Sequence, residues 1–223
     1  MGAMSKTTTN LEVRPLTEAR LPDLAALFDE GGDPKTCRCA FWRVAGSGWQ
    51  DWTKAQNQAV LASLAGREPA AGLIAYRDGQ AVGWVSVGPR EDYARLERSK
   101  VLARVDDKPV WSIVCFVVTR RLRGQGIARA VLDAAVEYAR DHGATLLEAY
   151  PVDSSRGRVP AASAYMGSLG MFEQAGFEVV ERRQWNKTTP IRPIVRRPIR
   201  PRRRQTLREA TATSKERPGE RAG

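Results

Sequence analysis

The residues with the clearest chemical potential form a short turn rich in glycine and arginine, Arg121-Leu122-Arg123-Gly124-Gln125-Gly126-Ile127-Ala128. An apolar, β-branched run at 110–118 precedes it and favours a strand buried on both faces. Apolar residues then recur at helical spacing up to His142, and Gly143 marks the end of the helix. The pattern predicts a strand, a tight turn and a helix that begins at the glycines.

A helix start of this kind binds phosphate oxygens through main-chain groups. Its first N–H groups have no intrahelical partner, and the helix dipole is positive there. Gly124 and Gly126 lack a Cβ, so a ligand can approach closely and the backbone can adopt unusual φ angles. Arg121, Arg123 and Arg129 add positive charge. The turn therefore predicts a pyrophosphate site.

The spacing of these residues narrows the kind of pyrophosphate ligand. The leading Gly and the Lys-Ser/Thr pair of a P-loop are absent, and a dinucleotide fingerprint would need a third glycine near Arg129. The segment instead resembles the acetyl-CoA signature of the GNAT superfamily of N-acetyltransferases, [Q/R]-x-x-G-x-[G/A], at Arg121, Gly124 and Gly126. Residues 171–177, Met-Phe-Glu-Gln-Ala-Gly-Phe, are similar to the late L-Y-E-K-x-G-F element of that family. The resemblance covers roughly residues 10–185.

The resemblance implies an α/β fold of layered α+β type, in which a mixed, mostly antiparallel sheet is flanked by helices. Hydrophobic periodicity agrees, and the D-G pair at 78–79 between two apolar runs predicts a hairpin. We expect strands at 11–15, 71–77, 80–88, 110–118, 144–150 and 177–185, and helices at 16–30, 49–65, 91–100, 127–142 and 161–174.

The resemblance also implies a reaction and a co-substrate. A primary amine of a small molecule or peptide would attack the thioester of acetyl-CoA directly in a ternary complex. The oxyanion donor would be a main-chain amide near Val117. The residues assigned to acetyl-CoA by the resemblance are Val117, Val118, Arg123, Gly124, Gln125, Gly126, Ile127, Ala128 and Phe172.

The candidates for the general base are carboxylates near the end of the expected strand at 144–150. Glu148 is the only carboxylate on that strand, and an apolar setting would raise its pKa toward working pH. Asp153, at the mouth of the strand, is the second candidate. Alternatively, Glu148 binds a structural arginine or the substrate ammonium, and water relays the proton.

The general acid is where the chain departs from the family pattern. The family's late-helix tyrosine falls at Phe172, which has no proton to give. Tyr165, about two helical turns upstream, would share a similar face and is the first replacement, with Tyr150 the second. The thiolate can also leave without help from the protein.

Basic residues gather at the C-terminal end of the chain. Residues 186–223 hold 12 Lys or Arg against 3 Asp or Glu, and so carry most of the net charge of +11. Prolines among the arginines disfavour a helix and favour extended chain. We therefore expect a disordered tail at 186–223 after a domain at 10–185, with a disordered N-terminus and a tag remnant at 1–9.

The basic tail suggests a second function class. Residues 190–208 could bind nucleic acid or another polyanion in a salt-dependent way. The chain would then be a nucleic-acid- or ribosome-associated protein whose acyl-CoA domain is regulatory or degenerate. Either function is compatible with a monomer or a homodimer.

Cysteine usage and hydropathy place the chain in a reducing compartment. Three cysteines, an N-terminal segment without a signal-peptide core and the lack of a long apolar run predict a cytoplasmic protein with no membrane span. Cys37 and Cys39 have C-x-C spacing, and His142 is the only histidine, so we expect no metal site. The loop at 37–43, with Phe41 and Trp42, would line the acceptor pocket in the GNAT fold.

Overall fold

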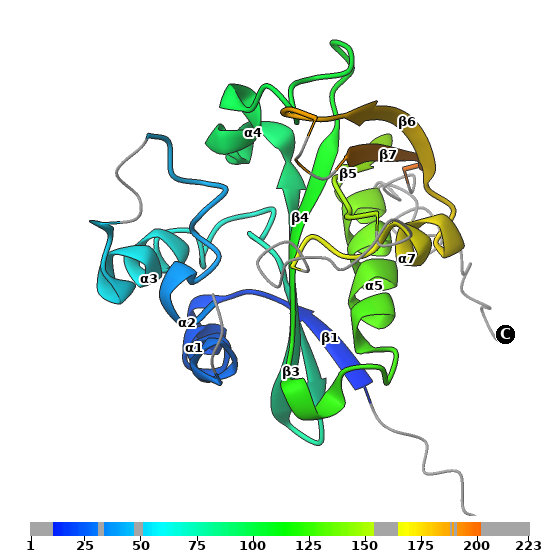
Figure 1. The fold of residues 1–223 in the computed structure, drawn as a ribbon. Coiled ribbons are helices and arrows are strands. Elements are labelled where there is room, and N and C mark those ends of the chain that lie inside the picture. Colours follow the sequence, from blue (N-terminus) through cyan, green and yellow to red (C-terminus); the bar gives the residue numbers. More distant parts are fainter. Residues whose placement is uncertain are drawn as a thin grey trace, which may run out of the picture.

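The described residues of the computed structural model, 11–30, 34–46, 51–153, 165–187, 189 and 191–201, contain one seven-stranded sheet. Its strands lie in the order β1-β2-β3-β4-β5-β7-β6, and only β4 and β5 pair in parallel. The strands are β1 (Leu11–Pro15), β2 (Leu73–Arg77), β3 (Gln80–Pro89), β4 (Trp111–Val118), β5 (Leu146–Ala149), β6 (Glu178–Arg183) and β7 (Arg192–Pro198). The expected α/β fold with a mostly antiparallel sheet is confirmed (Figure 1).

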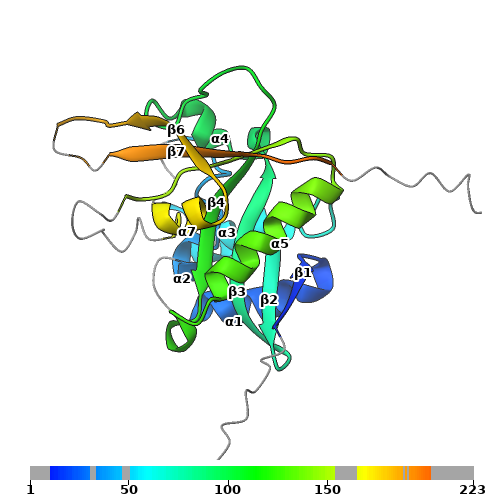
Figure 2. The same ribbon diagram turned by 90° about the vertical axis from the view of Figure 1, so that its right-hand side faces the viewer.

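Helices cover both faces of this sheet. The α-helices are α1 (Leu21–Asp29), α2 (Pro34–Cys37), α3 (Lys54–Ala62), α4 (Ala94–Arg98), α5 (Ile127–Asp141) and α7 (Leu169–Gln174). The short 3-10 helices are η1 (Glu18–Arg20), η3 (Arg90–Asp92) and η4 (Arg120–Leu122). Figure 2 shows α5 across one face of the sheet, with α7 near β6 and β7. None of the described helices is long and apolar enough to cross a membrane.

Two apolar cores lie on the two faces of the sheet. The first packs α5 and α7 against the sheet through residues such as Val131, Leu132 and Phe172. The second joins α1, the loop after α2 and α4 to the other face, and includes Trp84 and Tyr150. Because β3 and β4 contribute to both cores, their nearly continuous apolar sequence has a structural cause.

The hairpin predicted at the D-G pair is confirmed. Asp78 and Gly79 have φ of 51° and 76°, and they connect β2 to β3. Both values lie in the left-handed region, where a two-residue hairpin turn needs Asn, Asp or Gly. The strand before the signature and the helix after it also lie where the sequence predicts them.

The strands β4 and β5 separate after a short parallel contact. They pair only from Trp111 with Leu147 to Ile113 with Ala149. At the same level the pairing of β3 with β4 shifts by one residue, which leaves Val114 as an extra residue in β4. Beyond this bulge β4 continues to Val118 without β5 beside it. One main-chain edge of β4 is therefore released from the sheet near its C-terminal end.

The expected disordered tail is wrong for residues 192–198, which form β7 between β5 and β6. Pro193 and Pro198 lie at the ends of the strand, where a missing N–H costs least. Between them, Ile194 and Val195 are fully buried. The domain boundary expected at residue 185 therefore falls inside the fold. Residues 1–9 and 202–223 lie outside the described part of the chain.

Candidate functional site

The glycine-rich turn forms an open cradle at the start of α5. Gly124 and Gly126 have φ of 76° and 80°, and a Cβ at either position would meet no atom within 4 Å. The glycines are thus required by backbone conformation and not by crowding. The bond from Ala130 N to Gly126 O, 3.0 Å long, starts the helical ladder, so the preceding amides have no intrahelical acceptor. The turn presents main-chain N–H groups to an open surface.

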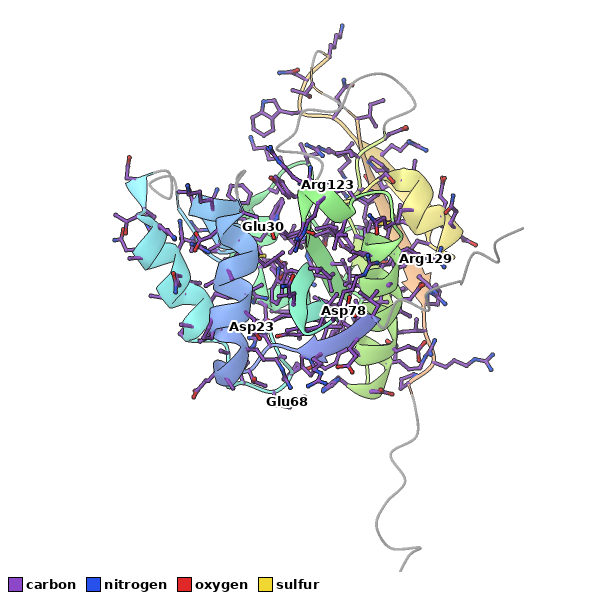
Figure 3. The ribbon with its side chains drawn as sticks, turned by 90° about the horizontal axis from the view of Figure 1, so that it is seen from below. Asp23, Glu30, Glu68, Asp78, Arg123 and Arg129 are labelled. Carbon is purple, nitrogen blue, oxygen red and sulfur yellow. The ribbon has the colours of Figure 1, made fainter. Side chains whose placement is uncertain are left out.

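The arginines of the turn are held by neighbouring acceptors. Arg121 Nη2 donates to Gln80 Oε1 at 3.1 Å, and Arg123 Nε donates to the Val118 carbonyl at 3.2 Å. Arg129 Nε donates to both carboxylate oxygens of Asp133 at 2.9 Å. Figure 3 shows Arg123 near the turn and Arg129 on the side of α5 near α7. The predicted cradle residues 123–128 thus form one turn with positive charge around it.

The released edge of β4 leads into this cradle. Thr119 N donates to Val82 O of β3, whereas Phe116 N donates to Tyr165 O at 2.6 Å on the other side of the strand. Main-chain groups alternate along a strand, so those of Phe116 and Val118 face the gap, whereas those of Val117 face β3. Of the main-chain amides near Val117, where the oxyanion donor is predicted, those of Phe116 and Val118 are the ones that face the gap.

Glu148, the expected general base, lies in a buried arginine network. Its side chain is 0% exposed. Oε1 accepts from Arg90 Nη1 at 2.9 Å and Oε2 from Arg196 Nε at 2.7 Å. Both oxygens are thus occupied by guanidinium groups. The structural-arginine alternative describes this geometry, and the role of Glu148 as the base stays a prediction.

Two further catalytic candidates are also tied to neighbours. Tyr150 is fully buried, and its hydroxyl donates to Glu148 Oε1 at 2.6 Å and accepts from Arg90 Nη1 at 2.5 Å. Burial, reinforced by the Glu148 charge, raises the pKa of Tyr150 well above its usual value. Asp153 accepts from Arg182 Nη1 at 3.1 Å. Neither group is placed by these contacts at the released edge of β4.

Phe172 and Tyr165 occupy opposite faces of the sheet, contrary to the shared helical face expected from sequence. Phe172 is fully buried in the core beneath α5 and lies edge-to-face with Phe116 of β4, with ring centroids 5.9 Å apart. The helix α7 begins only at Leu169, so Tyr165 lies in the turn before it. Its ring packs against the other core, while its carbonyl holds the Phe116 amide. Tyr165 therefore lies next to the gap because of its main-chain bond to Phe116, and not because it shares a helical face with Phe172.

Sequence reasoning missed Arg90 and Arg196, the two cations of the buried network. Arg90 is 0% exposed and also donates to the carbonyls of Leu96 and Leu102. Arg196 connects Glu148 to Asp106, because its Nη1 donates to Asp106 Oδ2 at 2.8 Å. Part of the basic segment at 190–208 is therefore used inside the fold, and residues 202–208 lie outside the described range. No local pattern marks either arginine, because Glu148, the partner that they share, is 58 residues from Arg90 and 48 residues from Arg196.

The loop after α2 packs onto β4 beside the bulge. The Cys39 thiol accepts a hydrogen bond from Trp84 Nε1 at 3.2 Å and another from the Cys115 thiol. The bond from Cys115 is the main cause that lowers the pKa of Cys39, and the same bond raises the pKa of Cys115. Arg38 and Cys39 have positive φ of 49° and 59°. These contacts hold the loop against the strand on the face opposite α5.

Comparisons with known proteins agree with this geometry. The model of the Acetyltransferase (GNAT) family matches residues 37–177. No curated protein sequence matches significantly. Among solved structures, the acetyltransferase of GNAT family from Streptococcus pneumoniae is similar, with a TM-score of 0.52, 14% identity and coverage of 85% of this chain and 99% of that chain.

Two other solved structures share the fold. The ribosomal-protein-alanine N-acetyltransferase from Brucella melitensis has a TM-score of 0.51 and 21% identity, with 84% of this chain and 99% of that chain covered. The Drosophila melanogaster polyamine N acetyltransferase, which catalyses formation of N acetylagmatine, has a TM-score of 0.56 and 12% identity, with 85% and 100% covered. At these identities the likeness extends to the fold alone.

Proposed function

Because this chain belongs to the acetyltransferase (GNAT) family, we propose that it transfers the acetyl group of acetyl-CoA directly to a primary amine. The observation that carries the proposal is the continuity between the open turn at Gly124–Gly126 and the released edge of β4. A pyrophosphate at the turn and an extended pantetheine arm along the strand would use both features together. The acceptor is an amine of a small molecule or a peptide.

The turn would bind the pyrophosphate through the free amides before Ala130, with Arg123 contributing charge. The main-chain groups of Phe116 and Val118 would hold the pantetheine arm. Their present partners are the Tyr165 carbonyl and the Arg123 side chain, so binding would exchange two internal hydrogen bonds for bonds to the ligand. Placing the thioester beside the bulge at Val114 would provide most of the rate acceleration.

Proton transfer would rely on water and Tyr165 and not on Glu148. Both Glu148 oxygens are bound to guanidinium groups, so a water molecule is the better carrier of the ammonium proton. The ring of Tyr165 packs against the core that includes Val114, Cys115 and Val117 of β4, and Tyr165 is our candidate to protonate the thiolate. Replacement by phenylalanine, with the pH dependence of kcat as readout, tests that role.

Calorimetric titration of acetyl-CoA into the full chain tests the proposal. We compare Gly126→Glu with Gly143→Glu, because both glycines have left-handed φ, 80° and 82°, and open space around the Cβ position. The two variants share the same backbone penalty and the same new charge, at opposite ends of α5. We expect micromolar binding by the wild type and by Gly143→Glu, and at least about tenfold weaker binding by Gly126→Glu.

Thermal unfolding of both variants is the control that tests whether each is folded at the titration temperature. Equal binding by the two variants would remove the turn as the pyrophosphate site. A wild-type chain that does not bind acetyl-CoA would overturn the proposed function.

A further inference from the structure

Two thiols from distant parts of the chain meet on the face of the sheet opposite α5. Cys39 follows α2, and Cys115 lies on β4. Both are free cysteines of the apolar core that includes Trp84, and they are 3% and 9% exposed. Figure 1 shows α2 on one side of β4 and α5 on the other. The acetyl transfer proposed above uses neither thiol.

The register of β3 and β4 explains why the two thiols are neighbours. Cys39 Sγ accepts a hydrogen bond from Trp84 Nε1 at 3.2 Å, so the Cys39 side chain lies over β3. Side chains alternate along a strand, and Ser86 therefore shares the face of Trp84. Ser86 is the partner of Cys115 across the β3–β4 pair, and directly opposed side chains lie close together. The Cys115 thiol is thus placed to donate its hydrogen bond to Cys39.

The surroundings of Cys39 favour its thiolate form. The hydrogen bond from Cys115 is the main cause that lowers the pKa of Cys39. Burial opposes this change, whereas the hydrogen bonds from Trp84 and Ser86 and the positive charge of Arg43 support it. Arg43 belongs to the same loop and donates to Ser86 Oγ at 3.4 Å. Cys39 is therefore the nucleophile of the pair.

The other titratable groups that face Cys39 stay protonated at neutral pH. The bond to Cys39 is the main cause that raises the pKa of Cys115, and burial adds to it. Burial also raises the pKa of Cys37 to about 11 and that of Tyr93 to about 12. One thiolate therefore faces one thiol, which is the arrangement that disulfide formation through a sulfenic acid needs.

We propose that Cys39 and Cys115 are a redox modification site, at which a hydroperoxide oxidises the two thiols to a disulfide between the loop after α2 and β4. The site is not sealed from a molecule as small as hydrogen peroxide, because Cys115 keeps 9% of its surface accessible and Cys37, at the end of α2, is only half-buried. A dithiol reductant would restore the two thiols.

The reaction proceeds in two steps. The Cys39 thiolate attacks one peroxide oxygen, so that an S–O bond forms, the O–O bond breaks and hydroxide leaves. The Cys115 sulfur then attacks the sulfenic acid at Cys39, so that the S–S bond forms, the S–O bond breaks and a second hydroxide leaves. The two hydroxides take up the two thiol protons. Each sulfur loses one electron, the peroxide gains two, and the products are one disulfide and two molecules of water.

Peptide mapping tests the proposal. The full chain is reduced, freed of reductant, treated with hydrogen peroxide at neutral pH and alkylated, and its unreduced peptides are identified by mass spectrometry. We expect two peptides joined through Cys39 and Cys115, which dithiothreitol separates. A disulfide between Cys37 and Cys39, oxidation without a disulfide, or no oxidation of either thiol would overturn the proposal.

Matched serine variants assign the roles of the thiols. Cys37→Ser removes the neighbouring thiol and should leave the rate of bond formation unchanged within about twofold. Cys115→Ser removes the second thiol, so the sulfenic acid at Cys39 should persist and be trapped by dimedone. Cys39→Ser should slow the oxidation of Cys115 at least about tenfold. Equally fast oxidation of Cys115 in that variant would overturn the role of Cys39, and circular dichroism checks that each variant is folded.

The pH dependence of the wild-type rate identifies the attacking group. Because the pKa of Cys39 is lowered, the rate of disulfide formation should reach half of its maximum below about pH 8.5, the ordinary value for a cysteine. A half-maximum at or above that pH would show that an ordinary thiol attacks the peroxide, and would overturn the assignment of Cys39.

Thermal unfolding tests whether the disulfide fits the folded chain. A bond between distant residues closes a long loop in the unfolded state, so the oxidised chain should unfold at least about 5 °C above the reduced chain. An unchanged or lower midpoint would show that the bond forms only after the chain has opened, and would overturn the proposal. None of these measurements uses acetyl-CoA, so their outcome is independent of the proposed acetyl transfer.

Discussion

The turn before α5 and the network around Glu148 are built by opposite means. The turn is made of main-chain groups from consecutive residues, with two left-handed glycines at its centre. The network is made of side chains from distant segments: Arg90 lies 58 residues and Arg196 48 residues from Glu148. The turn is open to solvent, whereas Glu148 and Arg90 are fully buried.

This contrast suggests that the turn serves ligand binding and that the network around Glu148 serves the stability of the fold. An open main-chain site can accept a ligand without unfolding anything, and its loss should affect binding more than stability. A buried ion network with every carboxylate oxygen occupied has no capacity for a ligand, and its loss should affect stability more than binding.

Glu148→Gln should have the largest effect. It leaves the Arg90 and Arg196 guanidiniums without the carboxylate that they share, which costs about 3–5 kcal/mol in the free energy of unfolding. Urea unfolding measures the loss. Glu12→Gln is the control, because Glu12 pairs with Arg14 at the surface and its removal should cost at most about 1 kcal/mol.

The comparison would break if Glu148→Gln were as stable as the wild type but lost activity together with the acidic limb of the kcat–pH profile, which is the rise of kcat as a general base loses its proton. Glu148 would then be a base, as its position on β5 first indicated. Preserved acetyl-CoA binding below the unfolding transition would confirm a structural role.

The difference between the two regions also explains what the sequence could predict. Residues 121–128 contain the whole turn, its glycines and the start of α5, so a local pattern was sufficient. Glu148 was found as the carboxylate on β5, but its partners were invisible because no local signal connects it with Arg90 or Arg196. The prediction of a base treated Glu148 as a carboxylate without neighbours, whereas in the fold it is bound by Arg90 and Arg196.

The tail shows a second limit of local sequence patterns. Prolines and arginines dominate the composition of residues 190–204, yet the short pair Ile194 and Val195 is fully buried in β7. Two apolar residues between prolines are too few for a periodicity test, and burial of the strand depends on its neighbours β5 and β6. Tertiary pairing therefore overrode composition.

Arg123→Gln should have an intermediate effect, confined to binding. It removes one positive charge from the turn and the bond from Arg123 Nε to the Val118 carbonyl. We expect acetyl-CoA to bind about tenfold more weakly, with the free energy of unfolding unchanged within about 0.5 kcal/mol. Calorimetry and urea unfolding give the two values. A large loss of stability with intact binding would place the turn on the structural side of the comparison.

Asp133→Asn should have a smaller effect of opposite sign. Asp133 pairs with Arg129, which lies one helical turn before it on α5, and both side chains are substantially exposed. Removing the carboxylate frees the guanidinium and reduces negative charge near the proposed phosphate site. We expect a severalfold gain in acetyl-CoA affinity at low ionic strength, lost at high salt, and almost no change in stability. A weaker affinity would show that Asp133 orients Arg129 productively.

Carboxylates beside arginines at or near the surface should each have a still smaller effect on stability, visible only in acid. The bond from Arg196 is the main cause that lowers the pKa of Asp106, and Arg104 and Arg183 do the same for Glu91 and Glu181. A folded-state pKa below the unfolded value adds stability above the unfolded value, and that stability is lost as pH falls through the folded pKa.

The thermal midpoint should therefore fall as the pH decreases below about 4. Asp106→Asn should make this decrease shallower. An unchanged slope in that variant would show that Asp106 contributes nothing to acid sensitivity.

The interior position of β7 determines when the sheet can be completed. β7 lies between β5 and β6 in the sheet, although it follows both of them in the sequence. Until residues 192–198 have been synthesised, β5 lacks a partner on one edge, β6 has no partner strand, and Glu148 lacks the bond from Arg196. The nascent chain therefore cannot reach the native sheet by adding strands in order of synthesis, and its C-terminal half must wait for a late insertion step.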